Sequence, residues 1–140
     1  MAGKAVNVTF DSKIFQDGGD ESYQVQATGQ LVQKGASWYL TYDEELPEQP
    51  VTQVLVKIEP DRLAITRTNV LKTRLVFEKG LVDHQPYQTA AGMMLLGTNT
   101  KTLRIDIDAV SGMGQVELAY SLSANGEVVG QYQVSLQFVQ

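Results

Sequence analysis

Apolar and polar residues alternate along most of this chain with the two-residue period of a β-strand. In Lys4–Phe15, the side chains of Val6, Val8 and Phe10 alternate with polar neighbours, and Ser22–Lys34 continues the pattern. This period predicts strands with one buried face. No stretch shows a 3.6-residue apolar period, so the sequence predicts about ten short strands and no helix.

Three strand-like runs follow one another between Val51 and Phe77, joined by very short turns. In the middle run, Leu63, Ile65 and Arg67 fall on one face. An arginine therefore occupies a position whose neighbours indicate the interior. We take the central segment as the part around which the fold is organised.

The second half is predicted to begin with a loop at Lys79–Pro86. Two shorter runs follow, Met93–Thr98 and Thr102–Asp108. Alternation then leads to a hairpin at Asn125-Gly126, and it resumes from Val128 to Phe138. These last two runs are the clearest strands of the chain.

Turn signals recur roughly every 8 to 12 residues, and neighbouring runs are joined by short turns, which favours an antiparallel meander. A meander of this many strands commonly closes to remove its edges. We predict one all-β domain over residues 1–140, an up-and-down β-barrel of about 8–10 strands, with a sandwich as the alternative. Gly29 is predicted to mark a bulge or bend where a strand turns a corner.

Composition narrows the function classes. The chain has no cysteine, which excludes disulfides, thiolate metal sites and a cysteine nucleophile. The net charge of −5 and pI near 4.7 give no basic footprint for nucleic acid. No apolar run approaches the roughly 20 residues that span a bilayer, and the first residues alternate like a strand instead of forming a signal peptide. We expect a soluble cytoplasmic protein, monomer or homodimer, without nucleic acid or membrane as partner.

The candidate binding residues are Arg67, Glu44, Tyr42 and Tyr120. Arg67 and Glu44 both lie on the inward register of their strands, and a charge inside a barrel needs a partner. In one interpretation Arg67 anchors the anionic head group of a ligand, with the Tyr42 and Tyr120 hydroxyls as partners. In the other, Arg67 and Glu44 form a salt bridge that closes one end and binds nothing.

The other candidate residues are His84 and a group of aromatic side chains. His84 is the only histidine and follows Asp83 in a predicted loop, but no serine nucleophile motif accompanies it. We predict an exposed histidine, no catalytic residue, no metal site and no cofactor. Aromatic residues form either core or a stacking surface for a flat ligand; these are Trp38, Tyr39, Tyr42, Tyr120 and Tyr132.

Several short motifs, in order, resemble the YwiB-like family of small bacterial proteins. They are Tyr42 with Glu44, Ile65 with Arg67, Tyr87 with Thr89, and the alternating strand of Leu118, Tyr120 and Leu122. The likeness runs from about Val6 to Phe138. It implies a calycin-type, lipocalin-like β-barrel and no particular activity, because such barrels serve unrelated roles.

Two functional hypotheses follow. The first is a non-enzymatic barrel that binds a small apolar, amphipathic or anionic ligand in its interior, which requires a cavity of a few hundred cubic ångströms. The second is a protein-interaction or structural module with a side-chain-filled barrel. In that case the Met93–Leu96 segment, which is apolar on both faces, docks a partner or a second copy.

Overall fold

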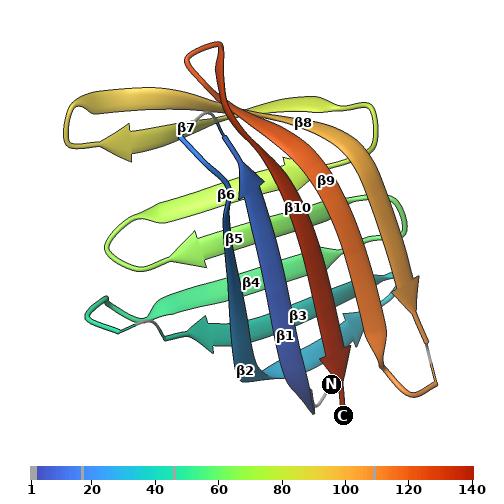
Figure 1. Cartoon of the computed structure of the whole chain (residues 1–140). Helices are drawn as coiled ribbons and strands as arrows, with labels where there is room; N and C mark the ends of the chain where they lie inside the picture. The colour runs from blue at the N-terminus through green and yellow to red at the C-terminus, as the bar shows by residue number, and fades with distance from the viewer. Residues whose placement is uncertain (1–2, 17, 46, 109) are drawn as a thin grey trace.

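Ten antiparallel strands form one continuous sheet in the computed structural model, which describes residues 3–16, 18–45, 47–108 and 110–140 (Figure 1). The strands are β1 (Lys4–Phe15), β2 (Glu21–Lys34), β3 (Ser37–Glu44), β4 (Thr52–Ile58), β5 (Leu63–Thr68), β6 (Lys72–Phe77), β7 (Val82–Thr89), β8 (Gly92–Ile107), β9 (Gly114–Ala124) and β10 (Glu127–Val139). The described residues contain no helix, so none that could cross a membrane.

The sheet closes almost completely on itself. Its order is β6-β5-β4-β3-β2-β1-β10-β9-β8-β7, so the first and last strands of the chain pair side by side. The remaining gap lies between β6 and β7, which no ladder joins within the described part of the chain. One side-chain hydrogen bond crosses near this seam, from the Thr98 hydroxyl to the Val76 carbonyl at 3.0 Å. The predicted antiparallel up-and-down barrel is confirmed.

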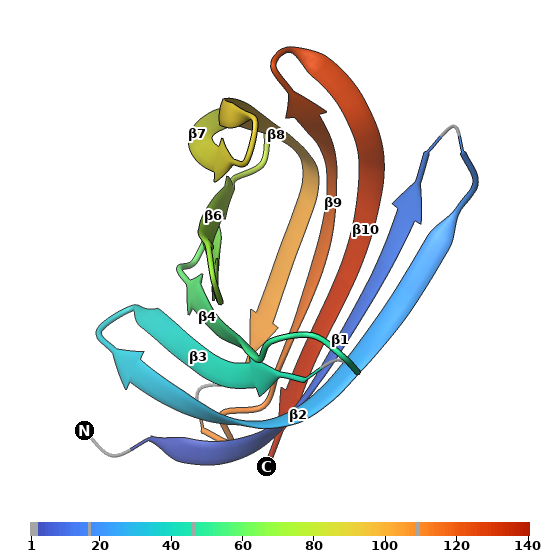
Figure 2. The ribbon, with the colours of Figure 1, turned by 90° about the vertical axis from the view of Figure 1, so that its left-hand side faces the viewer.

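Two long strands turn the corners of the barrel. Figures 1 and 2 show β2 and β8 bending so that β1, β10 and β9 form one layer and β3–β6 cross behind it at a large angle. Of the bulge or bend predicted at Gly29, the bulge is wrong, because the ladder is regular with both neighbouring strands. Gly29 instead permits a close approach: a Cβ there would lie 2.6 Å from the Thr41 carbonyl oxygen.

The structure also corrects the interpretation of the second half. The predicted loop Lys79–Pro86 is largely strand β7, and the two runs after it are one strand, β8. A register shift between Thr100 and Thr102 reverses which residues face inward, and this broke the alternation into two apparent runs. A second shift between Val128 and Gly130 leaves Val128 exposed instead of inward-facing.

The core lies between the two layers and is built from the inward face of each strand. Every second residue of β1, β3, β4, β9 and β10 is buried over much of the strand, while the intervening residues are mostly polar. The most deeply buried side chains include Phe77, Phe138, Leu40, Ile58 and Val116. Burial of these apolar side chains stabilises the barrel by about 1.5–3 kcal/mol each.

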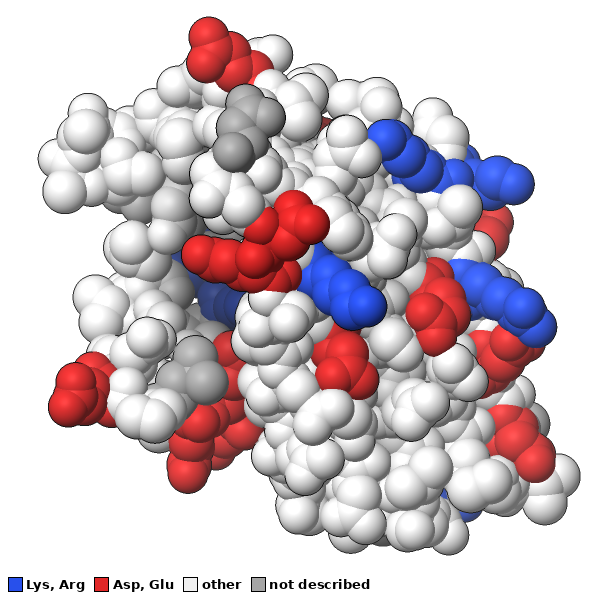
Figure 3. Space-filling view, viewed as in Figure 1, with Lys and Arg blue, Asp and Glu red and all other residues white. Residues whose placement is uncertain are grey.

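Acidic and basic side chains are interspersed on the face seen in Figure 3, where no continuous basic patch forms. This distribution agrees with the composition, which has 16 acidic residues against 11 lysines and arginines. A mixed surface of this kind gives no electrostatic track for a phosphate backbone.

Candidate functional site

One end of the barrel interior is hollow. Its cavity has a volume of about 400 Å³, opens to the solvent and is lined by inward-facing residues of eight strands. The lining residues are Phe10, Ser12, Tyr23, Ile65, Arg67, Thr73, Leu75, Phe77, Tyr87, Leu96, Leu118, Tyr120, Leu122, Tyr132 and Val134. The wall is thus mainly aromatic and aliphatic, with Arg67 as its one charged member.

Arg67 is held in the cavity wall by β5 and paired with Glu44 of β3. The Arg67 Nη2 and Glu44 Oε2 atoms are 3.5 Å apart, and the side chains are 28% and 8% exposed. Neither atom has a hydrogen-bond partner among the described residues. The guanidinium also lies 5.1 Å above the Phe10 ring. Arg67 therefore sits between a buried carboxylate and an aromatic surface.

Tyr42 lies beside this pair because of strand register. Val54 of β4 pairs with both Tyr42 on β3 and Arg67 on β5, so the two side chains share the inward face. The Tyr42 hydroxyl is buried and has no hydrogen-bond partner in the described chain. Burial raises the pKa of Tyr42 well above its ordinary value, an effect that the positive charge of Arg67 partly offsets. The hydroxyl stays protonated at neutral pH.

Three aromatic rings form one wall of the cavity. Tyr120 and Tyr132 stack nearly in parallel, with ring centroids 4.9 Å apart and planes 7° apart, and Phe77 tilts against Tyr120 at 4.6 Å. Burial raises the pKa of both tyrosines. Of the predicted binding residues, Arg67 and Tyr120 line the cavity, while Glu44 contacts Arg67 from outside the lining and Tyr42 is not part of the lining.

Sequence reasoning missed several cavity residues that are polar. Ser12, Tyr23, Thr73 and Tyr87 line the cavity, yet none was predicted to bind. Burial raises the pKa of Tyr23, and the nearby Arg67 charge opposes this rise. Tyr23 and Ser12 share the inward parity of their strands, which was a usable signal; the Tyr87 position depended on recognising β7.

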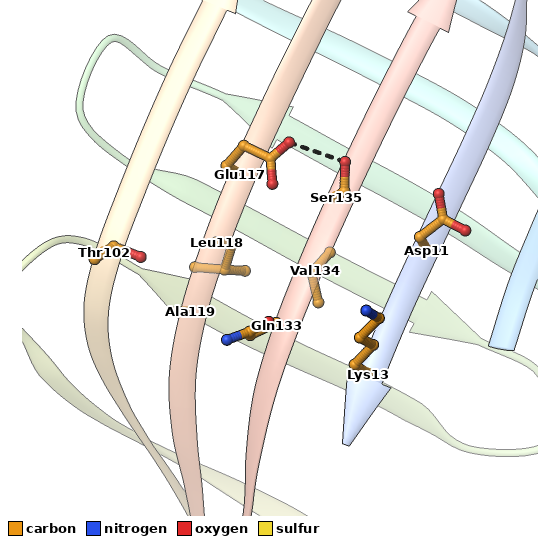
Figure 4. A pocket seen from close by; sticks show the side chains of 9 residues that line it. All are labelled: Asp11, Lys13, Thr102, Glu117, Leu118, Ala119, Gln133, Val134 and Ser135. Atoms are coloured by element: carbon orange, nitrogen blue, oxygen red, sulfur yellow. Dashed lines mark hydrogen bonds between the residues drawn. The ribbon is translucent and has the colours of Figure 1, made fainter. Parts of the chain in front are cut away.

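A second depression, of about 340 Å³, lies on the outer wall (Figure 4). Charged and polar side chains surround it, including Asp11, Lys13, Glu117 and Gln133. Its one drawn hydrogen bond runs from the Ser135 hydroxyl to Glu117 at 3.0 Å. Most of its lining residues are on the solvent-facing side of β1, β8, β9 and β10, and only Leu118 and Val134 among them also line the interior cavity. We therefore regard the interior cavity as the better candidate site.

The remaining candidates do not join the cavity. His84 is exposed on the outer side of β7, while its neighbour Asp83 accepts a hydrogen bond from Gln85 at 2.8 Å. Tyr39 lies beneath the Lys34 and Lys57 ammonium groups instead of in the cavity. Within the described residues, no three metal-ligating side chains form a cluster.

Comparison with known proteins places the chain in a family. The sequence pattern of a domain of unknown function, DUF1934, matches residues 8–136. The chain belongs to the DUF1934 family. Its DUF1934 domain is similar to the uncharacterized β-barrel protein YwiB of Bacillus subtilis (strain 168), with 28% identity over 116 residues, 83% of this chain and 80% of YwiB.

A crystal structure of the Bacillus subtilis ywiB protein matches this DUF1934 chain with a TM-score of 0.82. The match covers 99% of this chain and 94% of that one at 23% identity. At this identity the likeness shows the fold, and it supports the nearly closed barrel. The predicted resemblance to YwiB-like proteins is confirmed. The finer likeness to calycins and lipocalins stays a prediction.

Proposed function

We propose that this protein is a non-enzymatic binding protein that holds a small amphipathic molecule inside its barrel. The apolar part of the ligand occupies the cavity, and its polar end lies against Arg67. The observation that carries the proposal is the cavity of about 400 Å³ that has Arg67 in an otherwise uncharged wall. Ligand pockets of about 300–1,000 Å³ with few polar groups are typical of small-molecule sites.

The geometry of the ion pair supports binding over a purely structural salt bridge. A charge-assisted hydrogen bond has a donor–acceptor distance of about 2.7–2.9 Å, whereas Arg67 and Glu44 are 3.5 Å apart. Both contacting atoms and the Tyr42 hydroxyl lack hydrogen-bond partners within the described chain. A buried pair contributes to stability only when its geometry is good and its polar atoms are satisfied. The geometry of the Arg67–Glu44 pair is therefore not that of a salt bridge whose only role is to stabilise the fold.

The cavity wall also supports binding without catalysis. Its described side chains include hydroxyl groups and one guanidinium, but no carboxylate or imidazole. General acid–base catalysis needs a group that exchanges protons near neutral pH, and burial moves the tyrosine pKa values away from that range. The one histidine faces outward from β7.

Native mass spectrometry tests this proposal. The protein is purified gently from the organism that makes it, as the wild type, as Arg67→Ala and as Arg74→Ala. Arg74 is exposed on the outer side of β6, so it serves as the matched control. We expect a small molecule bound to the wild type and to Arg74→Ala, and its loss from Arg67→Ala. Bare wild-type protein, or retention in Arg67→Ala, would contradict the proposal.

A further inference from the structure

We propose that the ligand is a flat aromatic molecule whose polar group is an uncharged hydrogen-bond acceptor, such as a carboxamide. This inference rests on the proposed function and specifies the ligand class. Three features of the cavity carry it: the shape of its aromatic wall, the pairing of its only charge, and the donors that face it.

The aromatic wall selects a flat ring. Six of the fifteen lining residues are aromatic, and Tyr120 and Tyr132 already stack in parallel at 4.9 Å. A planar ligand can extend this stack or meet the tilted Phe77 ring edge to face, and such ring contacts add to the gain from burying apolar area. An engineered cavity of about 150 Å³ holds benzene. A cavity of about 400 Å³ therefore has room for a bicyclic ring.

The charge balance disfavours an anionic ligand. Arg67 is the only charged residue in the wall, and Glu44 already lies 3.5 Å from it. A ligand carboxylate would be attracted by Arg67 but repelled by Glu44, so the net attraction would be reduced. It would also lose its hydration, which costs several kcal/mol for an ion in a protein interior. Among the lining residues there is no second cationic side chain whose attraction could offset this loss of hydration.

The exposed donors favour a polar acceptor over an entirely apolar ligand. Nη2 of Arg67 is buried against Glu44, yet the Arg67 side chain is 28% exposed. The exposed surface of the Arg67 side chain therefore belongs to atoms other than Nη2, which is the atom that faces Glu44. Tyr23 and Tyr87, which both carry hydroxyl groups, also line the cavity. A carbonyl oxygen can accept from these donors without bringing a charge into the barrel.

Isothermal titration calorimetry at pH 7.5 with three probes tests each part of the inference. The probes are 2-naphthamide, which is flat and uncharged, 2-naphthoate, which has the same ring with a carboxylate, and octanamide, which has the same amide on a flexible chain. We expect 2-naphthamide to bind wild-type protein at least tenfold more tightly than either of the others.

Glu44→Gln removes the charge that neutralises Arg67 while keeping the side-chain size. We expect 2-naphthoate to gain at least tenfold in affinity for this variant, which a merely structural role of Glu44 would not produce. Glu117→Gln is the matched control, because it removes a carboxylate from the outer wall, and its probe preference should equal that of the wild type.

Each outcome has a separate meaning. Wild-type protein that binds none of the probes overturns this inference, whereas the proposed function is decided separately by native mass spectrometry of the purified protein. Tighter binding of 2-naphthoate than of 2-naphthamide overturns the uncharged acceptor but leaves the proposed function standing. Equal binding of octanamide and 2-naphthamide overturns the flat ring alone. The wild-type comparison is decisive even if Glu44→Gln fails to fold.

Discussion

Arg67 and Glu44 differ in how deeply they are buried, so removing one is not equivalent to removing the other. The Glu44 side chain is only 8% exposed, while that of Arg67 is 28% exposed. A charge left alone in the interior must either find water or lose its ionisation. Arg67 can reach solvent in the cavity more readily than Glu44 can.

We expect Arg67→Met to lower the free energy of unfolding by about 2 kcal/mol, and Glu44→Gln by about 1 kcal/mol. The double variant should regain much of the loss, because it leaves no unpaired charge. Urea unfolding measures all three. Equal losses in the single variants, or additive losses in the double variant, would show that the two residues do not interact.

Tyr42 carries a buried hydroxyl that has no hydrogen-bond partner among the residues that the structure describes. Because an unsatisfied buried hydroxyl costs free energy, Tyr42→Phe should raise the free energy of unfolding by about 1 kcal/mol. Its raised pKa means that the folded protein holds this proton more tightly than the unfolded chain does. The free energy of unfolding is therefore independent of this group below about pH 10, the pKa of an unfolded tyrosine. It falls as the pH rises further, because the unfolded chain releases the proton first.

Urea midpoints measured from pH 7 to 11 should therefore be nearly flat at first and fall above about pH 10, less steeply in Tyr42→Phe. Tyr39→Phe, on the outer wall, is the control and should follow the wild type. A fall of equal steepness in Tyr42→Phe and wild type would contradict this account of the Tyr42 hydroxyl.

Gly29 is needed for a close approach between β2 and β3. An alanine Cβ there would lie 2.6 Å from the Thr41 carbonyl oxygen and 3.2 Å from the Tyr42 Cβ. Since the first contact is with backbone, Gly29→Ala should lower the free energy of unfolding by about 1–3 kcal/mol. At Gly18 a Cβ meets nothing within 4 Å, so Gly18→Ala is the control in urea unfolding. Equal stability of the two variants would contradict the predicted clash.

At the scale of elements, strands with one buried face were predictable and the barrel edge was not. β1, β4, β9 and most of β10 alternate because one face packs in the core. β7 pairs on one side only and contains Pro86. Its inward-facing side carries the polar residues Asp83 and Gln85. For these reasons its sequence pattern predicts a loop. The bulge in β8 could not be predicted from the alternating pattern, because it changes which alternate residues face inward partway along one strand.

The β6–β7 seam is the weakest line of the barrel in hydrogen bonding. No ladder joins the two strands among the described residues. Near the seam, the Thr98 hydroxyl donates to the Val76 carbonyl at 3.0 Å, and the β6–β7 connection bonds to Thr100 of β8 through Gly80 at 3.2 Å and Leu81 at 3.3 Å. Edge strands open more readily than strands paired on both sides.

Hydrogen exchange should therefore be faster in β6 and β7 than in β1 and β10, as measured by mass spectrometry of peptides. Thr98→Val removes the hydroxyl bond across the seam and should speed exchange in β6 and β7 alone. Thr41→Val changes an exposed threonine on β3 and is the control. Uniform exchange over all strands would contradict a seam between β6 and β7.

The candidate site was partly predictable for the same reason as the strands. The two-residue alternation alone placed Arg67 and Glu44 on the inward face. The structure brings Nη2 of Arg67 to 3.5 Å from Oε2 of Glu44. Parity could not show which inward residues leave space between them. The cavity depends on how the bent layers diverge, and this follows from the curvature of β2 and β8 and not from local pattern (Figure 2).

For the whole molecule, the arrangement separates a packed half from a hollow half. Phe138, Val116 and Leu40 fill one region completely, whereas the other holds a cavity with Arg67 in its wall. The alternative function, a module that docks a partner, would use the outer side of β8, where Met93 and Leu95 are exposed. Docking of a partner on that face stays a prediction.

A two-dimensional ¹H–¹⁵N NMR titration with 2-naphthamide tests the central claim most directly, because it locates binding and detects it at once. The interior cavity and the outer depression have comparable volumes, about 400 and 340 Å³, but different surroundings. We predict the largest shifts at lining residues of the interior, including Arg67, Leu75 and Tyr120, with little change at Lys13 and Gln133. Shifts centred on the outer depression, or none at all, would contradict binding inside the barrel.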